Sequence, residues 1–201
     1  EILQNMGLTL HVAWRKKPTR KGFSLIDSKK ERSITIIGER LEPRSDDALE
    51  WGILEEMDGI FITAGDEKLF TLARQSKILC STPRVGISII NNSEVFIDCL
   101  VGSNLDPGEA YEVSDLNLKP KYMIKTEGKN GGVIIPGGRF SALKNRSRID
   151  SYGCGDSFAA GILYGLASEW SIEKVLTLGK VLGRNCLENF GPYPDLKAIN
   201  L

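Results

Sequence analysis

The chain has 201 residues, 41% of them hydrophobic, which is enough for a sizeable core in one domain or slightly more. Lysine and arginine together number 26, as do aspartate and glutamate, so the formal net charge is zero. A neutral chain lacks the basic surface typical of proteins that bind nucleic acid or anionic membranes, and we expect neither partner. The basic run at 15–21 is expected to be a solvated loop, with contact to an anionic ligand as the alternative.

Cysteine and histidine usage argues against a zinc centre or a disulfide framework. The four cysteines lie far apart, and the single histidine is His11. Such spacing does not form a zinc motif, and disulfide-rich scaffolds are normally much shorter. No apolar run reaches the roughly 20 residues of a membrane span and no signal peptide opens the chain, so we expect a cytoplasmic protein. The chain begins at Glu1 without an initiator methionine, which suggests that a preceding part is absent.

Strand-like apolar runs alternate with helix-like amphipathic runs along the chain. An antiparallel hairpin is predicted at 21–40, with a polar turn at 27–32. Further strands are predicted at 58–65, 77–82, within 94–103, at 121–128 and at 131–137, and helices at 46–57, 66–76 and from residue 156 onward. This order predicts an α/β fold: a three-layer α/β/α sandwich with a mostly parallel sheet, plus a small β-hairpin near the N-terminus. Ligands then bind beyond the carboxyl ends of the strands.

The stretch DSYGCGDSFAAG at 150–161 places a carboxylate where a glycine-rich loop becomes a helix. Glycines at 153 and 155 let the backbone approach a ligand closely, and the amides and dipole of a helix start favour an anion such as a phosphoryl group. Asp156 at the edge of such an anion hole could accept a proton from an attacking hydroxyl. The alternative is that Asp156 is an ordinary N-cap.

The same stretch resembles the C-terminal signature of the ribokinase-like carbohydrate kinase (PfkB) family, D-T-x-G-A-G-D-x-F-x-x-G. Ser151 stands for the Thr and Cys154 for the Ala of that signature, and both are small. The segments 22–39, 57–66 and 121–134 resemble the lid hairpin, the mid-chain strand and the T-x-G-x-x-G strand–turn–strand of that family, in the same order. The resemblance spans nearly the whole chain and corresponds to the latter two-thirds of a typical member.

The resemblance implies ATP-dependent phosphorylation of a hydroxyl on a sugar or related small molecule. Asp156 would be the catalytic base, and the amides of Gly153, Cys154 and Gly155 would form the anion hole. The residues implied on the nucleotide side are Thr126, Gly128, Gly131 and Asn189. Asp150 and Ser151 stand where family members often hold a monovalent cation such as K⁺. We expect Cys154 to act through its small size and its amide, although a helix N-terminus can also lower a thiol pKa and make it reactive.

The N-x-x-E motif, which organises magnesium and phosphate in the family, is altered here. After the strand at 98–102 the sequence reads SNLDPGE, so Ser103 and Asp106 take the Asn and Glu positions, or Glu109 takes the role instead. Carboxylates that hold magnesium through water suit either choice. The alternative for 106–108 is an ordinary turn.

Nothing in residues 1–20 matches the early sugar-binding aspartate or Gly-Gly motif of the family. We therefore expect one ribokinase-like domain over 1–201, with a lid-type hairpin at 21–37 and without the upstream substrate-binding part. The sequence therefore does not identify the substrate. A nucleoside kinase of the same family and a non-catalytic nucleotide- or sugar-binding scaffold are the alternatives. A dinucleotide oxidoreductase is disfavoured because no G-x-G-x-x-G opens a helix. An unpaired hairpin would expose an edge, which suggests a homodimer through the lid.

Overall fold

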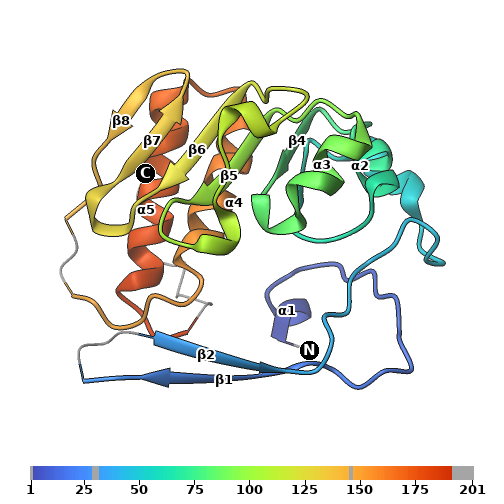
Figure 1. Cartoon of the computed structure of the whole chain (residues 1–201), viewed down its shortest axis with the longest axis horizontal. Helices are drawn as coiled ribbons and strands as arrows, with labels where there is room; N and C mark the ends of the chain where they lie inside the picture. Colours follow the sequence, from blue (N-terminus) through green and yellow to red (C-terminus); the bar gives the residue numbers. More distant parts are fainter. Residues whose placement is uncertain (1, 29–31, 145–146, 192–201) are drawn as a thin grey trace.

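The computed structural model describes residues 2–28, 32–144 and 147–191 (Figure 1). A four-residue helix, α1 (Ile2–Asn5), precedes the predicted hairpin, which consists of β1 (Lys21–Ile26) and β2 (Arg32–Ile37). The two strands are antiparallel, with Phe23 opposite Thr35, and form a separate two-stranded sheet. The predicted hairpin is thus confirmed, while residues 29–31 of its turn lie outside the described residues.

A six-stranded sheet forms the centre of the molecule. Its strands, in spatial and chain order, are β3 (Gly59–Ile62), β4 (Ile78–Ser81), β5 (Cys99–Ser103), β6 (Tyr122–Thr126), β7 (Gly132–Ile135) and β8 (Gly138–Phe140). Strands β3 to β6 run parallel, and β7 and β8 add on as antiparallel strands. The mostly parallel sheet predicted from the sequence is therefore present, and the strand at 138–140 was not predicted.

Helices cover both faces of this sheet. The α-helices are α2 (Glu67–Ala73), α3 (Ile87–Ser93), α4 (Cys154–Ala167) and α5 (Ile172–Leu187). Short 3₁₀ helices are η1 (Trp51–Glu56), η2 (Pro83–Val85), η3 (Pro107–Glu109), η4 (Val113–Asp115) and η5 (Gly128–Asn130). Figure 1 shows α4 and α5 together on one side of the sheet and α2 and α3 on the other. No helix within the described residues is both long and apolar enough to cross a membrane.

Alternating side chains on the strands build two hydrophobic cores. Ile62 and Leu79 pack with α2 and α3 in one core, whereas Phe61 and Cys80 belong to the core beneath α4 and α5. Successive side chains of a strand point to opposite faces, so burial on both faces requires continuous apolar runs. Each fully buried aliphatic or aromatic side chain contributes about 1.5–3 kcal/mol, which makes these two cores the main source of stability.

Glycines allow α4 and α5 to pack in close contact. A Cβ atom at Gly161 would lie 2.8 Å from Cα of Gly179, so a larger residue would push the helices apart. A Cβ atom at Gly59, the first residue of β3, would meet Leu163 in the second half of α4 at 2.8 Å. The C-terminal half of α4 therefore packs at the start of β3, which directs the N-terminus of α4 toward the carboxyl ends of the strands.

One prediction of secondary structure is wrong. The helix predicted at 46–57 is absent, and only η1 forms there. Asp47 instead accepts a hydrogen bond from the Arg44 amide at 2.8 Å and pairs with Arg15 at 2.7 Å, and these contacts fix a turn in place of a first helical turn. Helix α3 was not predicted, whereas β5 lies within the predicted range 94–103.

Candidate active site

The loops after β3, β4, β5 and β6 and the N-terminus of α4 all lie toward the carboxyl edge of the sheet. Parallel strands bring the loops that follow them to one edge, and the packing of α4 against β3 adds its N-terminus to that edge. Most of the residues singled out in the sequence stand on these segments. The edge is therefore the candidate active site.

The N-terminus of α4 has the backbone of an anion hole. Gly153 precedes the helix with φ 84°, in the left-handed region that favours glycine, and no side chain caps the helix. Gly155 follows in the first turn, where a Cβ atom would have no atom within 4 Å. The first amides of a helix lack partners within the helix, so this open start can receive an anion.

Asp156 is exposed in the first turn of α4. It is the third helical residue and not the N-cap, a position that Gly153 occupies, so the ordinary-cap alternative is wrong. A carboxylate here stands beside the amides of the helix start and faces solvent. This position is compatible with a base that takes a proton from a bound hydroxyl.

Asp150 anchors the loop that leads into α4. Its side chain is buried, with 6% exposed, and accepts hydrogen bonds from the amides of Tyr152 at 3.0 Å and Gly191 at 3.2 Å. The amide of Asp150 in turn donates to the carbonyl of Leu187 at 3.3 Å. These bonds hold the loop against the end of α5, while the neighbouring Ser151 is exposed.

Cys154 lies in a more buried environment than its place at a helix start suggested. Burial and the neighbouring Cys186 thiol raise the pKa of Cys154 to about 12. The Cys154 thiol donates weakly to the carbonyl of Asp150 at 3.8 Å, and Cys186 donates to the carbonyl of Tyr152 at 3.2 Å. The idea of a reactive, low-pKa thiol is therefore wrong, because desolvation outweighs the helix dipole.

The glycine-rich turn after β6 is shaped by the packing of the protein itself. A Cβ atom at Gly131 would lie 2.0 Å from the carbonyl oxygen of Phe140, so only glycine fits there. Gly128 has φ 57°, and a Cβ atom on it would touch Leu105 at 3.4 Å. Thr126 ends β6, and its hydroxyl donates to the carbonyl of Gly102 at 3.3 Å. The close packing at Gly131 and the positive φ at Gly128 explain why glycine stands at both positions, without a bound ligand. A role of these residues in nucleotide binding stays a prediction.

Asn189 follows the end of α5, and its side-chain amide donates to the carbonyl of Asn185 at 2.7 Å. That bond closes the last helical turn. Gly191, which contacts Asp150, lies two residues further along. The segment after α5 is thus held next to the loop before α4, while contact with an adenine stays a prediction.

The loop after β5 brings Asp106 and Glu109 together around a residue that the sequence analysis missed. Arg84, in η2 after β4, donates through Nε to Glu109 at 2.8 Å and also pairs with Asp106. Asp106 caps η3 by accepting from the amide of Gly108 at 2.8 Å, so the turn alternative for 106–108 is confirmed. The available signal in the sequence was the Pro83–Arg84 pair, which follows the buried strand β4 after one residue.

The side chains of this loop do not fit a directly bound magnesium ion. Each of the four carboxylate oxygens of Asp106 and Glu109 accepts an N–H group, from Arg84 or from the backbone. Within the described residues, no group of three or more histidine, cysteine, aspartate or glutamate side chains is placed to hold a metal ion. Direct coordination of magnesium by Asp106 and Glu109 is therefore not supported, and a contact through water stays a prediction.

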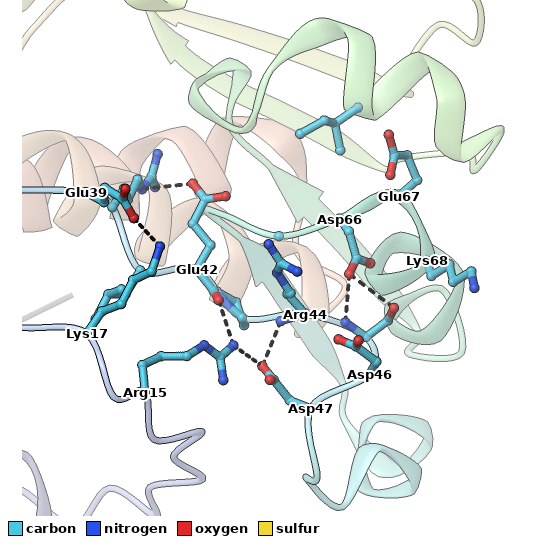
Figure 2. A pocket seen from close by; sticks show the side chains of 16 residues that line it. Arg15, Lys17, Glu39, Glu42, Arg44, Asp46, Asp47, Asp66, Glu67 and Lys68 are labelled. Atoms are coloured by element: carbon cyan, nitrogen blue, oxygen red, sulfur yellow. Dashed lines mark hydrogen bonds and ion pairs between the residues drawn. The ribbon is translucent and has the colours of Figure 1, made fainter.

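A pocket of about 890 Å³ lies between the loop after β3 and the segment that follows the hairpin (Figure 2). Charged side chains of both signs line it, and Figure 2 shows Arg15 and Lys17 from the basic run pointing toward Asp47 and Glu39. The basic run is therefore partly engaged in ion pairs, contrary to a purely solvated loop. Asp66 lines the pocket and caps α2 by accepting from the amide of Leu69 at 3.1 Å.

Comparisons with known proteins agree with this architecture. A family model described as "pfkB family carbohydrate kinase" matches residues 97–199. An ATP-dependent 6-phosphofructokinase of Thermoanaerobacterium thermosaccharolyticum is 29% identical over 117 residues, which cover 57% of this chain and 35% of that protein.

Solved structures of sugar and nucleoside kinases share the fold. An adenosine kinase from Sinorhizobium meliloti has a TM-score of 0.69 at 19% identity, covering 89% of this chain and 64% of its own. A probable sugar kinase from Rhizobium etli CFN 42 has a TM-score of 0.67 at 20% identity, covering 89% of this chain and 63% of its own. A ribokinase from Thermotoga maritima has a TM-score of 0.66 at 18% identity, covering 87% of this chain and 65% of its own.

The chain thus spans about a third of the curated relative and less than two-thirds of these solved structures. The family model nevertheless covers half of the chain, including β5 to β8 and the helix that carries Asp156. The fold, the open N-terminus of α4 and this match lead to one conclusion: the chain belongs to the pfkB family of carbohydrate kinases and has a ribokinase-like fold.

Proposed function

We propose that the protein containing this chain transfers a phosphoryl group from ATP to a hydroxyl of a sugar or related small molecule. The observation that carries the proposal is the uncapped N-terminus of α4, with Gly153 in the left-handed region and Asp156 exposed in the first turn. Such a helix start supplies partial positive charge and free N–H groups to a phosphate. An exposed carboxylate on the same turn supplies a proton acceptor.

In the proposed reaction the amides of the α4 N-terminus hold the transferring phosphate while the acceptor hydroxyl approaches in line. Asp156 accepts the hydroxyl proton as the oxygen bonds to the γ-phosphorus, and the bond from phosphorus to the bridging oxygen of ADP breaks. Asp150 keeps the loop before α4 in place by its bonds to Tyr152 and Gly191. Family membership implies ATP and magnesium as cofactors, and a K⁺ site at Asp150 and Ser151 remains part of the proposal.

The β1–β2 hairpin is proposed to act as a lid and as a contact between two copies. Apolar side chains on the hairpin are exposed, with Leu25 at 70% and Phe23 at 57%. Opposite residues of the two strands share a face, so Phe23 and Leu25 stand on one face while Ile34 and Ile36 stand on the other. Two apolar faces suit a ribbon that covers a ligand and also meets a partner.

The acceptor distinguishes a sugar kinase from a nucleoside kinase, and activity distinguishes both from a non-catalytic scaffold. The likeness to an adenosine kinase keeps the nucleoside acceptor open as a second candidate. The test is ATP consumption by the full-length gene product with magnesium and potassium, against a panel of sugars and nucleosides.

Two variants make this test specific. Asp156→Asn should lower turnover by about 10²–10⁴-fold while ATP binding changes little, because it removes the proton acceptor and keeps the shape of the site. Asp58→Asn is the matched control, since Asp58 pairs with Lys77 on the surface next to the start of β3, at the opposite edge of the sheet. Turnover that survives in Asp156→Asn would remove the proposed base. ATP binding without turnover for any acceptor would favour the scaffold.

A further inference from the structure

Arg84 lies between two carboxylates on the loop after β5. Its Nε donates to Oε1 of Glu109 at 2.8 Å, and its Nη2 pairs with Oδ2 of Asp106. The other oxygens are also taken: Oε2 of Glu109 accepts from the Ser103 amide at 2.7 Å, and Oδ1 of Asp106 accepts from the Gly108 amide at 2.8 Å. The guanidinium and two backbone amides thus satisfy all four carboxylate oxygens.

The backbone around Arg84 is shaped for this contact. Pro83 stands at the first position of η2 and fixes the turn that presents Arg84. A Cβ atom at Gly102, on β5, would lie 2.9 Å from Pro83 and 3.3 Å from Oε2 of Glu109. A glycine at 102 therefore opens the space in which the loop after β4 and the Glu109 carboxylate meet.

Charge and burial indicate what the guanidinium does there. The Glu109 side chain is only 11% exposed, against 52% for Arg84 and 38% for Asp106. A nearly buried carboxylate needs a positive partner, because an unpaired buried charge is costly. Burial lowers the pKa of Arg84, but the bonds and charges of Glu109 and Asp106 outweigh it and raise that pKa, so this positive charge is permanent.

Without Arg84, the carboxylates of Asp106 and Glu109 would form a pair with two negative charges at the carboxyl ends of the strands. Divalent cations such as Mg²⁺ and Ca²⁺ prefer oxygen ligands of this kind. We propose that Arg84 acts as a fixed cation in place of a protein-bound divalent metal, and that its removal turns the Asp106–Glu109 loop into a divalent-cation site. In the native protein this loop then binds no metal of its own. The inference holds whether or not the chain transfers phosphate.

The test uses Mn²⁺ alone, without nucleotide, on the full-length protein. Free Mn²⁺ is measured by electron paramagnetic resonance during titration of the wild type, Arg84→Gln, Arg84→Lys and Arg84→Gln/Glu109→Gln. We expect Arg84→Gln to gain one site beyond the wild type, with a dissociation constant of about 10⁻⁴–10⁻³ M, as in loosely built oxygen sites. The double variant should lose that site, and Arg84→Lys should behave like the wild type because it keeps the charge.

Thermal unfolding with and without Mn²⁺ is the second readout. Mn²⁺ should stabilise Arg84→Gln and leave Arg84→Lys unchanged, because an ion that binds only the folded state raises its stability. Three results would overturn the proposal. The first is a wild-type Mn²⁺ site that is lost in Arg84→Gln/Glu109→Gln. The second is a folded Arg84→Gln without a new site, and the third is an Arg84→Gln that stays unfolded even with millimolar Mn²⁺.

Discussion

Substitution of Gly155 tests whether this glycine is needed for ligand binding and not for packing. A Cβ atom at this position meets no protein atom within 4 Å, and the residue lies in the first turn of α4 outside the left-handed region. Gly155→Ala therefore causes no clash within the described residues. It should stabilise the helix by about 0.5–1 kcal/mol, since alanine loses less backbone entropy than glycine.

The same substitution should weaken ATP binding if a phosphate approaches the α4 amides closely. The methyl group would hold the phosphate away from amides whose charge-assisted hydrogen bonds each contribute about 1.5–3 kcal/mol. Loss of one such bond corresponds to a roughly ten- to hundredfold higher dissociation constant. Calorimetric titration with ATP and urea unfolding of the full-length protein measure the two effects separately.

Gly161→Ala on the same helix is the matched control. Its Cβ atom would lie 2.8 Å from the backbone of Gly179, so it should destabilise the protein by about 1–3 kcal/mol through overpacking. We thus expect Gly155→Ala to raise the free energy of unfolding and Gly161→Ala to lower it. A folded Gly155→Ala that binds ATP as tightly as the wild type would refute the anion-hole reasoning.

Two further predictions concern a partly buried thiol and a buried hydroxyl. Because folding raises the pKa of Cys154 to about 12, above the usual value of about 8.5, its contribution to stability is present at neutral pH and is lost as the pH rises through the alkaline range. Alkylation by iodoacetamide should accordingly be slow at pH 7.5, and Cys154→Ala should keep activity; fast labelling of Cys154 in the folded protein would contradict this. The buried hydroxyl of Tyr111 has no hydrogen-bond partner among the described residues, while Lys125 stands 4.5 Å from its ring centre. Tyr111→Phe keeps that ring and removes an unpaired hydroxyl, so urea unfolding should show stability unchanged or higher by about 1–3 kcal/mol, and a clear loss would reveal a partner for the hydroxyl.

Local patterns in the sequence were sufficient to predict the order and type of most elements. Buried parallel strands such as β4 and β6 need continuous apolar runs, and the glycine-rich turn after β6 requires particular residues, so both leave a local signal. The α4 N-terminus was predictable for the same reason, because two glycines and an aspartate at a helix start act through their own backbone. These features depend on residues that are neighbours in the chain.

Tertiary structure decided the features that depend on residues far apart in the chain. Arg84 meets Glu109 only because β4 and β5 run side by side and bring their carboxyl ends together. The helix predicted at 46–57 is lost partly because Arg15, 32 residues before Asp47, pairs with that carboxylate. The pKa of Cys154 likewise rises through burial under α5 and the thiol of Cys186. The preference for a strand, a turn or a helix start depends on a few adjacent residues. Charge pairing and desolvation, in contrast, arise only once the sheet has brought distant segments together.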